Sequence, residues 1–418
     1  MFSFSSNKSN WCIAYYLMLL VAMFFLMQPF TTPPMMTRLI FFGFVFLPTI
    51  MMPRILPAVL LLFYGIDKSS FTHVLPETDM YIFIMVLVCY VLYKEKSLFL
   101  LRALGGVLYF FICALIHYYV SDFFSWILVA ILLSDMIKNK DDLNLLFHAY
   151  LAISLFLGLL FLVHQQVFAI QYGRAVDDLE RSGWINNNVF GGAIAAGGVF
   201  AIAYLTGVFR FAKNRITTLL SITTIIIVFI VLTLNASRGA FIGFLLAATL
   251  FFITSNSKLY VKLLIIIVAG IVCYLMYTKD TFALLQIRME SDNTATMGGR
   301  LLIWKSKLQA FFSIPDFWKL LFGIGQLECV KIGVYYSTHN DFVTSIIAYG
   351  FIGFIIFLYI LIYPIKKSGK KKWHSIFLLL YLFVECFVLE PIFRGYLIEI
   401  VFYFFVLKYA LINDTEPA

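Results

Sequence analysis

The sequence predicts an all-α fold: a polytopic membrane helical bundle of about 12 transmembrane helices, with a large structured periplasmic loop between late spans. Of the 418 residues, 62% are hydrophobic and 13% are charged, proportions that exclude a soluble domain of this size. Apolar residues run continuously instead of alternating, which favours helices over an outer-membrane barrel. Most loops between the apolar segments are short and basic, as in multi-pass membrane proteins.

The apolar segments are spaced along the whole chain. They lie at about 11–30, 38–52, 55–65, 80–93, 97–119, 122–137, 143–164, 184–207, 216–235, 240–254, 259–277, 343–364, 374–390 and 396–411. A spanning helix needs about 20 residues. The segments at 38–52 and 55–65 are short and are interrupted by Pro48 and Pro53, so we expect 12 spans, with 14 as the upper limit. The first segment lacks a small-x-small cleavage site and is expected to be a retained anchor.

Basic clusters orient the chain. They occupy alternate loops: Lys94 and Lys96; Lys138 and Lys140; Arg210, Lys213 and Arg215; Lys258; and Lys366, Lys367, Lys370, Lys371 and Lys372. One orientation places every cluster in the cytoplasm, together with both termini. The net charge of +9 therefore sets topology and does not indicate a nucleic-acid partner.

This orientation divides the chain into three regions. They are a transmembrane bundle with short loops at 1–277, a periplasmic loop at 278–342, and C-terminal transmembrane helices at 343–418. Within the loop, Arg300–Phe312 has the pattern of an amphipathic helix lying at the interface, with Lys305 and Lys307 turned to water. A long structured loop among short ones is where function is expected.

Cations recur on the outer side, where the positive-inside rule makes them scarce. They are Arg174, Arg181, Arg238, Arg288, Arg300, Arg394 and His339. A guanidinium group binds phosphate oxygens in a bidentate manner, so these residues indicate an anionic ligand, for which a lipid-linked diphosphate is the candidate. The alternatives are structural: Arg238 can snorkel to the headgroups, and nearby acidic residues can pair with Arg174, Arg181, Arg288 or Arg394.

His339 belongs to the most distinctive local pattern. Nine residues separate Asn340 from Gly350-Phe-Ile-Gly353, and the two glycines would let a neighbouring helix or lipid chain approach closely. His339 is expected at the outer mouth of the bundle, with an interfacial, helix-capping histidine as the alternative. A second polar stretch follows Arg181, where Asn186 and Asn188 enter a span and can bind sugar hydroxyls or a headgroup.

Several kinds of chemistry lack a motif. We find no HxxxH, HExxH or DxD metal pattern, no Walker loop and no GxGxxG, so no metal, cofactor or nucleotide donor is expected. The six cysteines show no CxxC spacing, and Cys329 in the large loop has no evident partner.

The chain resembles the O-antigen ligase and O-antigen polymerase superfamily of bacterial envelope glycosyltransferases over residues 180 to 365. The matching pieces are Arg181-Ser-Gly-Trp-Ile-Asn-Asn-Asn, Ser237-Arg238-Gly239-Ala240-Phe241, Gly299-Arg300-Leu-Leu-Ile-Trp304, Phe322-Gly323-Ile-Gly325 and His339-Asn340-x9-Gly350-Phe-Ile-Gly353. The last piece resembles the ligase signature in full. The family's Arg-x-x-x-Leu pattern is met loosely, because Ile242 stands where leucine is expected.

The resemblance implies a metal-independent enzyme of the bacterial inner membrane that acts on glycans carried by undecaprenyl diphosphate. It implies catalytic roles for His339, Arg238 and Arg300, with His339 as general base. Substrate contacts are expected from Arg174, Arg181, Arg288, Asn186, Asn188 and Asn340. The expected partners are the lipid-linked glycan donor, membrane lipids, and a lipid A core or lipid-linked repeat as acceptor.

Three functions remain open at this stage. An O-antigen ligase would use the lipid A core as acceptor, and the full ligase signature favours it. A surface polysaccharide polymerase of the same superfamily would use another lipid-linked repeat. A lipid-linked oligosaccharide flippase would instead carry charges through the middle of its spans, whereas the ionisable residues here gather on one face.

Overall fold

The computed structural model describes residues 55–59, 61–62, 108, 112, 136–163, 187–209, 214–234, 237–254, 274, 299–369, 372–388, 391–393 and 397–414. Within these residues every regular element is a helix, so the all-α prediction is confirmed there. Three of the described helices are long and apolar enough to cross a membrane. The prediction of about 12 spans is not tested, because six of the predicted spans lie wholly or almost wholly outside the described residues. They are the spans at 11–30, 38–52, 80–93, 97–119, 122–137 and 259–277.

The bundle helices and the helix at 300–312 begin and end close to the predicted boundaries, and the two short helices at 317–322 and 326–331 were not predicted. The helices and their bounds are α7 (Lys140–Val163), α9 (Asn187–Leu205), α10 (Arg215–Leu234), α11 (Arg238–Thr254), α14 (Arg300–Phe312), α15 (Phe317–Phe322), α16 (Gln326–Lys331), α17 (Asp341–Lys367), α18 (Lys372–Val388) and α19 (Leu397–Asp414). The candidate spans are α7, α10 and α17, and shorter apolar helices cover Phe190–Leu205 in α9 and Gly239–Thr254 in α11.

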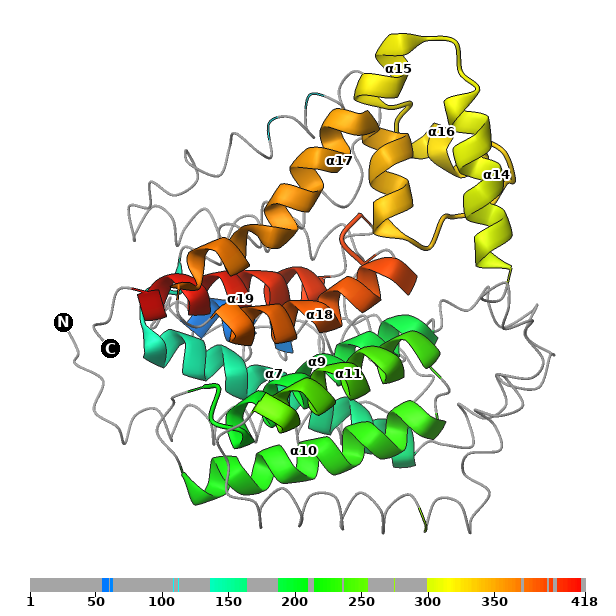
Figure 1. Ribbon diagram of the computed structural model, residues 1–418. Helices are drawn as coiled ribbons and strands as arrows, with labels where there is room; N and C mark the ends of the chain where they lie inside the picture. The colour runs from blue at the N-terminus through cyan, green and yellow to red at the C-terminus, as the bar shows by residue number, and fades with distance from the viewer. Residues whose placement is uncertain are drawn as a thin grey trace, which may run out of the picture.

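Helix α9 packs at the centre of the bundle, against α7, α10 and α11, while α18 lies along α11 and α19 lies beside α17 and α18 (Figure 1). Small residues on α9 permit this packing. A Cβ at Gly197 would overlap Ser154 of α7, and one at Gly198 would lie 2.8 Å from Phe244 and 2.9 Å from Val228. Hydrogen bonds join the layers: Ser154 Oγ donates to Ile194 O (2.9 Å).

Helices α14, α15 and α16 stand at one end of the described structure, packed against the first half of α17 (Figure 1). Helix α14 has the predicted bounds. Lys305 is exposed as predicted, but the prediction for Lys307 is wrong: this side chain is fully buried. Its Nζ donates to the carbonyls of Cys329 (2.6 Å), Val330 (2.9 Å) and Ile332 (3.1 Å). The last turn of a helix leaves carbonyls without intrahelical donors, and Lys307 supplies donors for the end of α16.

Helix α17 is bent at Gly350, where φ is 69° and ψ is −173°. The bend frees two carbonyls upstream, which accept hydrogen bonds from the α15–α16 connection: Ile324 N donates to Ile347 O and Gly325 N to Ala348 O, both at 3.0 Å. The close approach expected at Gly350 is made by the backbone at the end of α15, because a Cβ there would overlap Leu321 and lie 2.6 Å from Gly323 N.

Candidate functional site

Arg300 is the first residue of α14 and is half-buried. Gly299 precedes it with a φ of 82° and provides no side chain to cap the helix. The carbonyl of Gly299 accepts the first helical hydrogen bonds, from the backbone N–H groups of Leu302 and Ile303 (both 3.1 Å). A helix N-terminus carries a partial positive charge, so the guanidinium group and the helix end both favour an anion at this point.

His339 immediately precedes the N-cap of α17 and adopts a φ of 48°. This left-handed conformation costs a residue other than glycine about 1–3 kcal/mol. Its neighbours hold it there: Thr338 and Asn340 are buried, whereas His339 is partly exposed. The Nε1–H of Trp304 donates to Thr338 O (2.7 Å). Because Trp304 lies one turn beyond Arg300, this bond ties the start of α14 to the His339 segment.

Asn340 anchors the start of α17 to the end of α18, and Asp341 anchors it to the turn at 391–393. Asn340 Oδ1 caps α17 by accepting from Val343 N (3.0 Å), and its Nδ2 donates to Phe387 O (3.2 Å). The two carboxylate oxygens of fully buried Asp341 accept from Ile392 N and Phe393 N, each at 3.0 Å. Both ends of the Asn340 amide therefore bond to backbone groups of the protein, Val343 N and Phe387 O.

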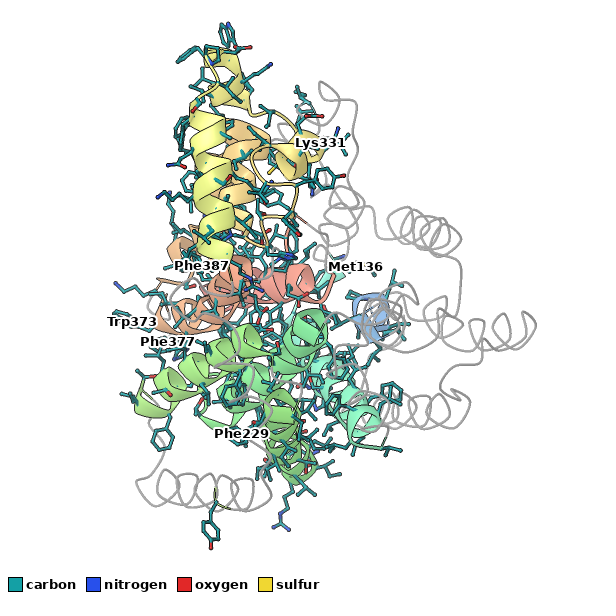
Figure 2. All side chains as sticks on the ribbon, turned by 90° about the vertical axis from the view of Figure 1, so that its right-hand side faces the viewer. Met136, Phe229, Lys331, Trp373, Phe377 and Phe387 are labelled. Atoms are coloured by element: carbon teal, nitrogen blue, oxygen red, sulfur yellow. The ribbon has the colours of Figure 1, made fainter. Side chains whose placement is uncertain are left out.

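The end of α18 meets both α14 and α11. Figure 2 shows Phe387 where α14 reaches the bundle, and its ring lies 5.0 Å from that of Trp304, edge to face. On the other side, Gly239 of α11 lies so close to Val388 that a Cβ would overlap it. Arg238, the residue before Gly239, begins α11. The backbone positions of Arg238, Arg300 and His339 therefore surround the last turn of α18.

The N-termini of α9 and α19 join this end of the bundle. A Cβ at Gly191, in the first turns of α9, would lie 2.6 Å from Cβ of Ser237, the residue before α11. A Cβ at Gly192 would lie 2.7 Å from Oε1 of Glu399, in the first turn of α19. The starts of α9, α11, α14, α17 and α19 thus gather around the end of α18, and their dipoles favour an anionic ligand here.

Two buried acidic residues belong to this region and were not among the predicted site residues. Glu385 of α18 and Glu399 of α19 are each 1% exposed. The signal was present in the sequence, because a carboxylate inside an apolar segment is rare and has a function or a partner. What the sequence could not show is that both reach the same glycine of α9.

The other predicted site residues cannot be placed. Arg174, Arg181, Asn186, Arg288 and Arg394 lie outside the described residues, and for Asn188 and Arg238 the backbone is described but the side chain is not. Among the described residues, no group of three or more His, Cys, Asp or Glu side chains is arranged to hold a metal ion. Cys329 is buried, and its carbonyl accepts from Nζ of Lys307.

The fold and the gathered helix ends are those of an apolar, helical membrane protein with a structured segment outside its bundle. Residues 222–358 match the family model described as O-antigen ligase. The match confirms the resemblance predicted from the motifs over this stretch, which holds Arg238, Arg300 and His339. The matched family is one of glycosyltransferase-like enzymes. A comparison with curated proteins found no match.

Proposed function

We propose that this protein is an O-antigen ligase that transfers a glycan from undecaprenyl diphosphate to the lipid A core, at the periplasmic face of the bacterial inner membrane. The observation that carries the proposal is the gathering of Arg238, Arg300 and His339 around the end of α18, within a stretch that matches the O-antigen ligase family. These residues are separated by up to a hundred positions in the chain, and their types suit transfer from a diphosphate.

Arg238 and Arg300 bind the diphosphate in this mechanism. Each is the first residue of its helix, so guanidinium and helix dipole act on the same anion. Charge grows on the diphosphate as the glycosidic bond breaks. Preorganised cations that offset this charge in the transition state lower the barrier, typically by several kcal/mol.

His339 acts as general base. The acceptor hydroxyl oxygen bonds to the anomeric carbon, its proton passes to the imidazole, and the bond from the anomeric carbon to the diphosphate oxygen breaks. Undecaprenyl diphosphate leaves with the bonding electron pair, and the anomeric configuration inverts. An imidazole suits this task because its unperturbed pKa of about 6.5 lies near neutral pH, and a positioned base contributes about 10²–10⁴-fold.

The remaining predicted residues have supporting roles. Arg174, Arg181 and Arg288 extend the cationic surface toward the donor, and Asn186 and Asn188 contact sugar hydroxyls. We assign Asn340 to positioning, because its amide caps α17 and holds Phe387 O, which fixes the backbone beside His339. The proposed chemistry needs neither a metal ion nor a cofactor.

Transfer by purified protein tests the proposal. Protein in detergent is given the undecaprenyl-diphosphate-linked glycan and lipid A core, with a chelator present, and the glycosylated acceptor is measured. His339→Ala, Arg238→Ala and Arg300→Ala should each lower transfer by about 10²-fold or more. Arg→Lys should rescue poorly, because an ammonium group lacks the bidentate fork. The matched control is Lys331→Ala, which removes an exposed cation at the end of α16 that pairs with Glu328 (2.9 Å) and is not one of the proposed site residues.

The same assay separates the ligase from the polymerase, since the family match covers both. A ligase glycosylates lipid A core, and deletion of its gene leaves bare core while lipid-linked polymer accumulates. A polymerase extends a lipid-linked repeat, and its deletion leaves core carrying one repeat. Full activity of His339→Ala would remove His339 from the mechanism, and absence of any transfer would favour the flippase.

A further inference from the structure

Helix α15 leaves three aromatic side chains uncovered. Phe317 is 63% exposed, Trp318 is 66% exposed and Phe322 is 36% exposed. The rings of Trp318 and Phe322 lie 6.0 Å apart and are stacked, so the two side chains share one face of this six-residue helix. Large apolar side chains gathered on a surface mark a place where a membrane or another protein binds.

The second half of α17 has one buried face and one exposed apolar face. Gly353, Phe357 and Leu361 are buried against the rest of the protein. The exposed residues recur every three or four positions, which places them on one side of the helix. They are Phe351, Ile355, Tyr359 and Ile362. Helix α17 is one of the candidate membrane spans, and an apolar face that a span does not pack against protein faces lipid. These four residues form the lipid-facing stripe.

The lipid-facing stripe adjoins α15 at the bend of α17. Phe312, the last residue of α14, stacks on Phe351 with the ring centres 5.9 Å apart. Gly350, just before Phe351, lies against the backbone of Leu321 and Gly323 at the end of α15. Figure 1 shows α15 standing over this bend. The exposed aromatic residues of α15 therefore continue an apolar surface that begins on a membrane span.

The length of α17 below the bend sets the depth of α15. Lys366 and Lys367 end the helix, and their Nζ atoms lie 6.0 Å and 5.6 Å from the ring centres of Tyr359 and Tyr363, a combination typical of the membrane–water boundary. From Lys366 to Gly350 the helix is about 24 Å long, whereas the hydrocarbon core is about 30 Å thick. With the lysines at one boundary, the bend lies within the opposite leaflet, and any tilt of the helix lowers it further.

We propose that α15 is seated in the leaflet opposite the lysine-rich end of α17, where phospholipid covers Phe317, Trp318 and Phe322. Lys319, exposed between these rings, supplies a cation for the headgroups, and tryptophan beside lysine suits this boundary. The carboxylate of Asp316 is used within the helix, since it accepts from Trp318 N (2.9 Å). Only the short connection at 313–316 separates α14 from α15, so this seat fixes the depth of α14. The inference concerns where the segment lies and needs no step of the proposed transfer.

Quenching of tryptophan fluorescence by lipid tests the proposal. The purified full-length protein is reconstituted in vesicles of phosphatidylcholine and phosphatidylglycerol, with or without bromine on the acyl chains. The chain has six tryptophans, so the signal of Trp318 is the difference between wild type and Trp318→Phe. Two substitutions on the Trp318→Phe background provide matched positions. Ile355→Trp lies on the lipid-facing stripe, and Lys331→Trp is exposed at the end of α16.

Brominated lipid should quench the Trp318 signal by about twofold or more, as it does the signal of Ile355→Trp, and acrylamide in the water should quench both weakly. Lys331→Trp should show the reverse. A Trp318 signal that follows Lys331→Trp would overturn the proposal, because α15 would then lie in water. A signal that neither agent quenches would also overturn it, since protein, such as a second copy of the chain, would cover α15. Absence of lipid quenching at Ile355→Trp would overturn the depth argument itself.

Discussion

Replacing Gly350 by alanine should loosen the segment that carries His339. Gly350 has a φ of 69° and a ψ of −173° at the bend of α17, a conformation that is essentially restricted to glycine and costs alanine about 1–3 kcal/mol. The added Cβ would also overlap Leu321 and lie 2.6 Å from Gly323 N. These are backbone atoms, so the α15–α16 connection must move away from α17.

The movement threatens the two hydrogen bonds that cross the bend, from Ile324 N and Gly325 N (both 3.0 Å). Each contributes about 1 kcal/mol. Together with the cost of the backbone conformation, Gly350→Ala should destabilise the protein by about 3–5 kcal/mol. Transfer should also fall, because the first half of α17 begins directly after His339 and would lose one of its supports.

Gly207 supplies a matched control for this prediction. It also has a positive φ, of 78°, but a Cβ there would meet nothing within 4 Å. Gly207→Ala therefore carries the backbone cost without the overlap, and should destabilise by about 1–2 kcal/mol. The midpoint of thermal unfolding in detergent, followed by tryptophan fluorescence, measures both variants. An unfolding midpoint for Gly350→Ala at or above that of Gly207→Ala would refute the reasoning.

Three further substitutions test contacts around the site, each by the shift in unfolding midpoint. Lys307→Met removes the three hydrogen bonds to the end of α16 and should lower the free energy of unfolding by about 2–3 kcal/mol. Lys305→Met, at an exposed position, should lower it by less than about 0.5 kcal/mol. Equal effects would contradict the burial of Lys307. Asp341→Asn should cost about 2 kcal/mol, because an amide offers one acceptor oxygen where two backbone N–H groups now bind; an unchanged midpoint would show that these bonds are weak. Trp304→Phe keeps a ring against Phe387 but removes the donor to the His339 segment. It should cost about 1 kcal/mol and lower transfer, and full transfer would argue against that tie.

Much of the fold followed from local sequence signals. Apolar length and basic loops predicted the described bundle helices within a few residues, and amphipathic periodicity predicted Arg300–Phe312 as a helix. Periodicity failed at Lys307 because its burial depends on where α16 ends in space. A helical pattern marks the face of one element and carries no information about its neighbour.

The site was predictable in part. The motif around His339 and the arginines at 238 and 300 were predicted to share one side of the membrane, and their backbone positions lie at one end of the described bundle. The bend at Gly350 was not foreseen, since a glycine within an apolar run has the same appearance whether the helix continues or breaks. The meeting of Glu385 and Glu399 at Gly192 depends on three helices packing together, which a linear pattern does not encode.

Photo-crosslinking with a diazirine-bearing undecaprenyl diphosphate glycan tests most directly whether the outer cations form one diphosphate site. The diazirine is placed next to the diphosphate, and labelled peptides of the purified protein are mapped by mass spectrometry. The account predicts labels at the starts of α11 and α14 and around His339, all displaced by unlabelled undecaprenyl diphosphate. Displaceable labels confined to the lysine-rich end that joins α17 to α18 would contradict it.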